Sequence, residues 1–347
     1  MTAYKSGLAC TLVASCLFST PILAKQVDSE AKEQSYDVKC VMEKISSLDE
    51  NMPISEIRAQ CKLVSLEGVE RKPEKHSRGP ISNRMLKERR TAFDPYVITP
   101  HRMNYVLPVL TTNQINSQAY DHVEGYSENL VDIESKFQLS LKAPLNHRDI
   151  FTRGDALLFA FTLEAWWQVY SDNISKPFRE TNYRPELFYL TPLQWHPFDG
   201  NTGLVLGIEH QSNGRSQLLS RSWNRVYAGF LYEKGDFALS FKPWVRISEE
   251  EKEHPLDPDG DDNPDISDYM GHFQLGMVYK MDDYEFSLGG RQNFGQHHGA
   301  LELGFTFPLW GKLRGYATAF TGYGESMIDY NYKQTRFGIG IALNNVL

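Results

Sequence analysis

The chain has 347 residues, of which 41% are hydrophobic, 12% aromatic and 23% charged, and its formal net charge at pH 7 is −8. The excess of acidic residues argues against a nucleic-acid-binding protein, which would carry a basic surface. The 25 glycines and the many aromatic residues are typical of numerous alternating strands and not of a dry, uniformly apolar core.

Residues 1–24 have the pattern of a signal peptide. Lys5 precedes an apolar stretch over residues 8–18, and cleavage is expected after Ala24. A lipoprotein site at Cys16 is the weaker alternative, because apolar sequence continues beyond this cysteine. No later stretch has the length and hydropathy of a membrane helix, so we expect the chain to be exported without one.

Residues 25–95 are predicted to form a small helical extension. Apolar residues have helical spacing over 36–48 and 54–66. Cys40 and Cys61 are the cysteines that remain after cleavage, and an oxidising compartment favours a disulfide between them over a catalytic or metal-binding role.

The stretch 70–90 is predicted to be a mobile linker. It is rich in lysine and arginine, contains Pro73 and Pro80, and has few apolar residues. A basic run of this kind usually lies in solvent.

From residue 96 onward the sequence predicts an all-β domain, 96–347. Apolar and polar residues alternate in segments bounded by Gly, Pro, Asn and Asp, which is the signal of strands. The predicted strands are 101–111, 134–144, 155–168, 184–193, 202–212, 222–233, 236–248, 267–281, 283–293, 298–308, 313–323 and 334–346. Their number, twelve, is even.

The connections between these strands favour a twelve-stranded antiparallel transmembrane β-barrel of the bacterial outer membrane. Tight turns at 234–235 and at Asp282 alternate with long polar loops such as 112–133 and 249–266. Aromatic residues gather toward strand ends, as interfacial girdles require: Trp166, Trp167, Tyr189, Trp195, Trp223, Tyr227 and Trp244. The N- and C-termini of the barrel domain, and the extension 25–95, are then expected to face the periplasm. A soluble β-sandwich would also alternate, but it rarely needs so many aromatic strand ends.

One face of the strand at 202–212 carries a candidate catalytic group. Side chains two residues apart share a face, so a row of aliphatic residues ends with His210 and Ser212. Asn224 continues an apolar row on the strand at 222–233 and can come to lie beside His210. In a membrane barrel such rows face lipid, which places the three residues on the outer wall near the long loops. Taken singly, each fits an interfacial polar residue without chemistry, but together they supply a nucleophile, a base and an orienting amide.

Several motifs, occurring in one order, resemble the outer-membrane phospholipase A family. They are residues 136–141 (KFQLSL), 177–183 (PFRETNY), 212–225 (SNGRSQLLSRSWNR), 242–244 (KPW), 262–266 (DNPDI) and 322–331 (GYGESMIDYN). The resemblance runs from about Tyr96 to the C-terminus. It implies a twelve-stranded, calcium-dependent barrel enzyme of Gram-negative bacteria.

The resemblance also implies roles for individual residues. Ser212 is similar to the family's nucleophile, His210 to its base and Asn224 to the residue that orients the imidazole. The backbone N–H of Gly214 matches an oxyanion-hole donor, and a fixed donor of this kind can lower a barrier by ~3 kcal/mol.

The calcium ligands implied by the resemblance are the side chain of Ser220, the carbonyl of Arg215 and, from a second subunit, the carbonyl of Ser175. Hydroxyl and carbonyl oxygens suit a hard cation. The acidic run 257–265 is not an EF-hand, because Asp262 stands where the loop needs glycine. Asp262 itself matches an alternative calcium ligand of the family.

Two positions depart from the family pattern. Leu163 replaces a barrel-wall glutamine associated with the dimer contact, which bears on how strongly two copies pair. The chain ends in Leu347 and not in the usual terminal aromatic residue of outer-membrane barrels.

The sequence therefore predicts a calcium-dependent serine hydrolase of membrane glycerophospholipids, with A1, A2 and lysophospholipase activity and a reversible homodimer. The alternative is a non-enzymatic barrel, either a pore or an anchor. Acyl-position preference, headgroup preference and the activation signal do not follow from the residues.

Overall fold

The computed structural model describes residues 79–346 apart from 92, 95–96, 255 and 258. The predicted signal peptide, the helices at 36–48 and 54–66, and the Cys40–Cys61 pair lie outside the described residues. The strands are β1 (Thr99–Pro100), β2 (Tyr105–Thr112), β3 (Ile133–Pro144), β4 (Ala156–Trp167), β5 (Phe178–Leu193), β6 (Asn201–Ser212), β7 (Ser222–Lys234), β8 (Phe237–Ile247), β9 (Phe273–Met281), β10 (Tyr284–Asn293), β11 (His298–Trp310), β12 (Leu313–Tyr323) and β13 (Lys333–Ala342). The helices are α3 (Pro80–Thr91) and α4 (Ile266–Met270), with short 3-10 turns η1 (Gln118–Tyr120), η2 (Ser127–Asn129), η3 (Pro197–Asp199) and η4 (Gln217–Leu219).

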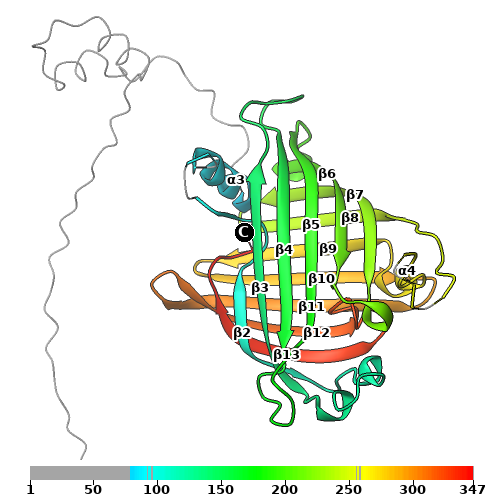
Figure 1. Ribbon diagram of the computed structural model, residues 1–347. Coiled ribbons are helices and arrows are strands. Elements are labelled where there is room, and N and C mark those ends of the chain that lie inside the picture. The colour runs from blue at the N-terminus through cyan, green and yellow to red at the C-terminus, as the bar shows by residue number, and fades with distance from the viewer. Residues whose placement is uncertain (1–78, 92, 95–96, 255, 258, 347) are drawn as a thin grey trace, which may run out of the picture. The chain divides into compact units, whose positions relative to one another are not determined.

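The strands β2 to β13 form a closed antiparallel barrel (Figure 1). Each strand pairs with its neighbours in the sequence, β13 returns to pair with β2, and β1 adds a two-residue extension to β3. Twelve strands therefore close the sheet without a free edge, as the alternating pattern predicted, and the predicted fold class is confirmed.

The barrel is apolar outside and polar inside, the reverse of a soluble barrel. Large hydrophobic side chains on its outer face are exposed, among them Leu141, Phe161, Ile208, Val226 and Phe241. Charged side chains are buried in the interior: Glu134, Lys136, Arg179, Glu180, Glu186, Glu209, Arg225, Glu285, Asp329 and Arg336. Such a wall is suited to a lipid environment. Among the described residues, no helix has the length and hydropathy to cross a membrane.

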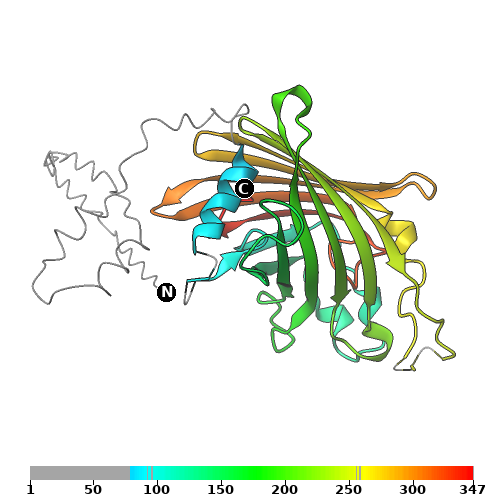
Figure 2. The same cartoon turned by 90° about the horizontal axis from the view of Figure 1, so that it is seen from above.

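The connections after β7, β9 and β11, at one end of the barrel, are tight turns, whereas most connections at the other end are longer loops (Figure 2). The turns after β7, β9 and β11 each need a residue in the left-handed region, and Gly235, Asp282 and Gly311 supply it with φ values of 56°, 53° and 58°. The long loops carry η1, η2, η4 and α4. In the predicted orientation the short turns are periplasmic.

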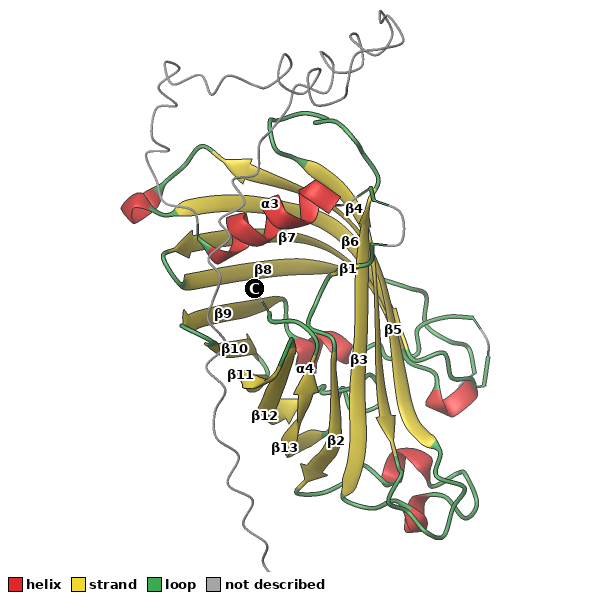
Figure 3. Cartoon of the chain, turned by 90° about the vertical axis from the view of Figure 1, so that its left-hand side faces the viewer, coloured by secondary structure: helices red, strands yellow, loops and turns green. Residues whose placement is uncertain are grey.

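Helix α3 lies at the end of the barrel with the short turns, beside the C-terminal segment (Figure 3). The carboxylate of Glu233, at the end of β7, accepts hydrogen bonds from the backbone N–H groups of Gly79 (3.1 Å), Ile81 (2.6 Å) and Ser82 (3.1 Å). Arg84 donates to the carbonyls of Pro100 (2.7 Å) and other residues at this end. The first turn of the helix therefore has partners for its free N–H groups.

The stretch 70–90 was predicted to be a mobile linker, and this prediction is wrong from residue 80 onward, where α3 begins. The stretch reads as a solvated basic run because its residues are mostly charged. Its order comes from Glu233, which lies far along the chain and has no signature in the local sequence.

Replacing Glu233 with glutamine should loosen α3. The substitution removes the negative charge that faces the helix N-terminus and one of its two acceptor oxygens, and the loss of an N-terminal cap costs about 1 kcal/mol. Amide hydrogen exchange in α3 should become about fivefold faster, while exchange in β7 stays unchanged. Glu124→Gln, in an exposed loop at the other end, is the matched control. Equal protection of α3 in both variants would contradict the assigned role of Glu233.

Candidate active site on the outer wall

The register of β6 and β7 brings the candidate catalytic residues to one place on the barrel wall. His210 pairs with Asn224, and Ser212 pairs with Ser222. Ser212 is the last residue of β6, two positions beyond His210, so both side chains are on the same face. This face also carries the exposed side chain of Ile208, which places the group on the outer wall.

The imidazole of His210 contacts the side-chain amide of Asn224. The distance between His210 Nδ1 and Asn224 Oδ1 is 2.9 Å. An amide oxygen can only accept a hydrogen bond, so Nδ1 is the donor in this contact, and in the neutral imidazole the lone pair is then on Nε2. A neutral imidazole held in this tautomer can accept a proton from a neighbouring hydroxyl.

Buried residues alternate with the candidate catalytic residues along the two strands and support them from inside. Trp223 donates its indole N–H to Gln211 at 3.1 Å. The guanidinium of Arg225 lies over the Trp223 ring at 3.9 Å and over the Trp244 ring at 4.7 Å. These contacts hold the inward side chains of the two strands that carry His210, Ser212 and Asn224.

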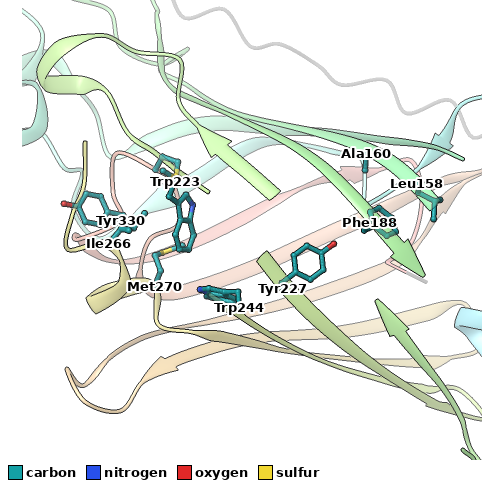
Figure 4. Packing of buried hydrophobic residues seen from close by; sticks show 10 residues of the cluster. Leu158, Ala160, Phe188, Trp223, Tyr227, Trp244, Ile266, Met270 and Tyr330 are labelled. Atoms are coloured by element: carbon teal, nitrogen blue, oxygen red, sulfur yellow. The ribbon is translucent and has the colours of Figure 1, made fainter. Parts of the chain in front are cut away.

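Helix α4 packs against the same interior aromatic residues (Figure 4). Ile266 and Met270 are buried in a cluster with Trp223, Trp244 and Tyr330. The sequence pattern had predicted a strand from 267; this is wrong for 267–272, because the apolar residues over this stretch have helical spacing and point into the barrel. The loop that contains α4 is thereby held near the strand that carries Asn224.

Asn213 organises the loop that follows Ser212. Its side-chain oxygen accepts hydrogen bonds from the backbone N–H groups of Arg215 (3.2 Å) and Arg221 (3.0 Å), and its amide donates to the Leu219 carbonyl at 2.8 Å. Gly214 adopts a φ of 64°, where a side chain would be strained. The backbone next to Ser212 is therefore rigid, as an oxyanion donor requires.

Two of the candidate calcium ligands lie in contact. Ser220 Oγ donates to Asp262 Oδ2 at 2.6 Å, and Lys252 Nζ lies 2.5 Å from Asp262 Oδ1. Arg215 belongs to the same loop as Ser220. Ser175 is exposed in a different loop, between β4 and β5. Among the described residues, no three or more His, Cys, Asp and Glu side chains gather as a metal site.

Sequence reasoning missed four residues that surround this group: Asn213, Glu249, Lys252 and Asn263. Asn263 Oδ1 accepts from the backbone N–H of Ser222 at 2.9 Å, and Glu249 Oε1 accepts from Asn224 Nδ2 at 2.9 Å. Asn213 had a signal, because it is the inward-facing residue directly after Ser212. The other three lie in the long loop after β8, where no local pattern marks them.

A closed twelve-stranded barrel with a lipid-facing exterior, carrying a hydroxyl, an imidazole and an amide on that exterior, defines an outer-membrane enzyme of the hydrolase class. The family model described as Phospholipase A1 matches residues 81–343. The chain therefore belongs to the phospholipase A1 family and is an outer-membrane phospholipase. The match begins at residue 81, so it includes most of α3, which corrects the predicted start of the resemblance at Tyr96.

Curated relatives and solved structures agree with this assignment. The phospholipase A1 of Escherichia coli K12 is 38% identical over 271 residues, which cover 78% of this chain and 88% of the relative. That of Klebsiella pneumoniae is 37% identical over 273 residues, with coverage of 78% and 89%. The structure of outer membrane phospholipase A from Escherichia coli matches with a TM-score of 0.67 at 37% identity, over 73% of this chain and all 100% of that one. The Salmonella typhi outer membrane phospholipase, a dimer with bound calcium, matches with a TM-score of 0.68 at 36% identity, over 76% and 97% of the two chains.

Proposed function

We propose that this phospholipase cleaves acyl esters of glycerophospholipids with Ser212 as nucleophile, His210 as general base and Asn224 as the residue that orients the imidazole. The observation that carries the proposal is the 2.9 Å contact between His210 and Asn224, on the same lipid-facing wall as Ser212. A polar group on such a wall is costly unless it has a function.

The reaction follows from these positions. Ser212 Oγ attacks the ester carbonyl carbon while its proton passes to His210 Nε2, and the backbone N–H of Gly214 donates to the oxygen that becomes negative. His210 then gives the proton to the departing glycerol oxygen, which leaves an acyl-enzyme and a lysophospholipid. Water then attacks the acyl carbonyl carbon as its proton passes to His210 Nε2, and His210 returns the proton to Ser212 Oγ as the acyl–Oγ bond breaks and the fatty acid leaves. Throughout, Asn224 Oδ1 accepts from Nδ1–H and stabilises the imidazolium.

The test is fatty-acid release from phospholipid micelles by the detergent-purified protein. Phospholipids with two different acyl chains, and their lyso forms, separate A1, A2 and lysophospholipase activity. Planar-bilayer conductance addresses the alternative, because an open pore would conduct, whereas a barrel filled by buried charged side chains should conduct almost nothing. A folded barrel that conducts and releases no fatty acid would overturn the proposal.

We propose that the enzyme binds calcium beside this site. The residues present fit the ion, because the Ser220 hydroxyl, the Asp262 carboxylate and the Arg215 carbonyl are hard oxygen donors. Ser175 of a second copy would add a carbonyl. When bound, calcium would supply positive charge near the developing oxyanion. Activity with calcium and its loss with a chelator test this dependence.

Lys252 should weaken calcium binding, because its ammonium lies 2.5 Å from an oxygen of Asp262. A cation that binds the Asp262 carboxylate must displace the Lys252 ammonium. Lys252→Met should therefore lower the Kd for calcium about fivefold, the effect of a partly exposed ion pair of roughly 1 kcal/mol. Calorimetric titration of the detergent-solubilised protein measures this shift without an activity assay. The control is Lys312→Met, in an exposed turn at the opposite end of the barrel. An unchanged Kd in Lys252→Met would show that calcium does not use Asp262.

The proposed quaternary state is a reversible homodimer through the outer wall, and the similar Salmonella typhi protein is a dimer with bound calcium. Leu163 lies on β4 next to the exposed aromatic side chain of Phe161, so this wall offers apolar area in place of an amide contact. Sedimentation in detergent with and without calcium tests it, and a monomer with full activity would rule it out. The extension before the barrel is proposed to be periplasmic, at the end with the short turns.

A further inference from the structure

The side-chain amide of Asn224 contacts a carboxylate on the side away from His210. Asn224 Nδ2 donates to Glu249 Oε1 at 2.9 Å, while Asn224 Oδ1 contacts His210 Nδ1, also at 2.9 Å. The three side chains therefore form a continuous chain of hydrogen bonds that runs from the long loop after β8 to the imidazole.

The position of Glu249 follows from strand pairing. Asn224 pairs with Ile247, the last residue of β8, and Glu249 comes two residues later, on the same side of the backbone if the strand direction continues. The side chain of Glu249 is half-buried, so its contact with Asn224 is partly shielded from water.

We propose that Glu249 is a positioning residue for the reaction proposed above, on which this inference rests. A side-chain amide can present either its oxygen or its nitrogen to a neighbour, and the two ends are nearly equal in shape. A carboxylate only accepts hydrogen bonds. Glu249 therefore holds the amide with its nitrogen outward and its oxygen toward His210, which keeps the proton on Nδ1 and leaves Nε2 free to act as the base.

The carboxylate has a second effect through the amide. Hydrogen bonds in a chain polarise one another, and an ionised acceptor strengthens the bond that it receives. The oxygen of Asn224 becomes a better acceptor, which favours the imidazolium that forms when Ser212 loses its proton. A neutral asparagine thus obtains part of the effect of an aspartate, while the negative charge itself stays on Glu249.

The first test compares Glu249→Ala with Glu250→Ala. Loss of a hydrogen bond to an ionised group corresponds to about a tenfold effect, so kcat should fall about tenfold in Glu249→Ala while KM changes less than twofold. Glu249→Asp should restore part of kcat, because it keeps the acceptor on a shorter side chain. Glu250→Ala should match the wild type, because this neighbouring side chain is exposed. Circular dichroism verifies that each variant is folded.

A double-variant experiment separates the proposed contact from a general effect on the loop. In Asn224→Asp two carboxylates would meet where the amide now bridges, and their repulsion should displace the group that orients His210. In Asn224→Asp combined with Glu249→Gln, the new amide can donate to the new carboxylate, which can still accept from His210. The double variant should therefore be at least tenfold more active than Asn224→Asp alone.

Two outcomes would overturn the inference: an unchanged kcat in folded Glu249→Ala, or a double variant that is no more active than Asn224→Asp alone. These outcomes are distinct from failure of the proposed function. If Ser212→Ala remains active, the proposed nucleophile is wrong, whereas an inert Ser212→Ala together with a fully active Glu249→Ala rejects the role of Glu249 alone.

Discussion

Ser212→Ala should abolish fatty-acid release, with kcat falling by about four to six orders of magnitude, as expected when the nucleophile of a hydrolase is removed. The reason is that no acyl-enzyme can form without the Oγ atom, and His210 then has no hydroxyl to deprotonate. The substitution removes one oxygen at the half-buried end of β6, so the barrel should fold as before.

The matched control is Ser222→Ala. Ser222 lies directly opposite Ser212 in the β6–β7 register and is also half-buried, so it differs mainly in lacking the imidazole two residues away on its strand. Its activity should stay within a few-fold of the wild type. Measuring both with calcium and with chelator on the same phospholipid separates the nucleophile from effects on metal binding. Activity that survives in Ser212→Ala, or an equal loss in the two variants, would assign the nucleophile elsewhere.

Arg179→Met should reduce the free energy of unfolding by about 3–5 kcal/mol, as expected when one partner of a buried charge network is removed. Arg179 and Glu134 have no exposed side-chain surface, and the Nε–Oε2 distance between them is 2.9 Å. Arg179 Nη1 also lies 3.1 Å from Asp329 Oδ2. Methionine fills similar space but leaves both carboxylates short of a partner inside the barrel.

Some of this network would remain. Arg336 still reaches Glu134 at 2.6 Å, and Ser326 still donates to Asp329 at 2.6 Å. Glu325, in the loop between β12 and β13, belongs to the same region; burial alone would raise its pKa, but Arg336 and Lys136 outweigh burial and lower it to about 2. The surviving cations therefore limit the loss.

Urea unfolding of the protein in detergent, followed by tryptophan fluorescence, measures this change. Arg148→Met is the control, since Arg148 is exposed in the turn between β3 and β4, and its effect should stay within about 0.5 kcal/mol. Arg215 donates to the backbone carbonyls of Phe178 (2.8 Å) and Arg179 (3.1 Å), and the substitution keeps both acceptors of the loop next to Ser212. Equal midpoints for the two variants would show that the network contributes little to stability.

The strand pattern could be predicted from the sequence because a membrane barrel repeats with period two and its tight turns require Gly or Asp. The prediction was poorest where that period fails. Strand β5 begins at Phe178 and not at 184. Its first residues include Arg179, Glu180 and Asn182, which are buried in the polar interior, so this part of the strand has the polar composition of a loop. The stretch 267–272 was read as strand although α4 occupies much of it.

The pairing of His210 with Asn224 could also be predicted, because a loop of known length between two strands sets their register. The contacts of Glu249 and Lys252 could not. Both lie in a long polar loop whose path is determined by the packing of α4 under Trp223 and Trp244 and by hydrogen bonds such as that from Asn263. No local spacing in the sequence encodes that path.

The cap that Glu233 places on α3 has a consequence for the order of folding. Gly79 and Glu233 are separated by 154 residues, and the carboxylate reaches its place only when β7 has joined the sheet. A helix of 12 residues is marginal in water without tertiary contacts. Although α3 is synthesised before every strand of the barrel, it becomes ordered only after β7, the sixth of the twelve barrel strands, has joined the sheet. Protection of α3 in a refolding time course would therefore report that β7 is in place.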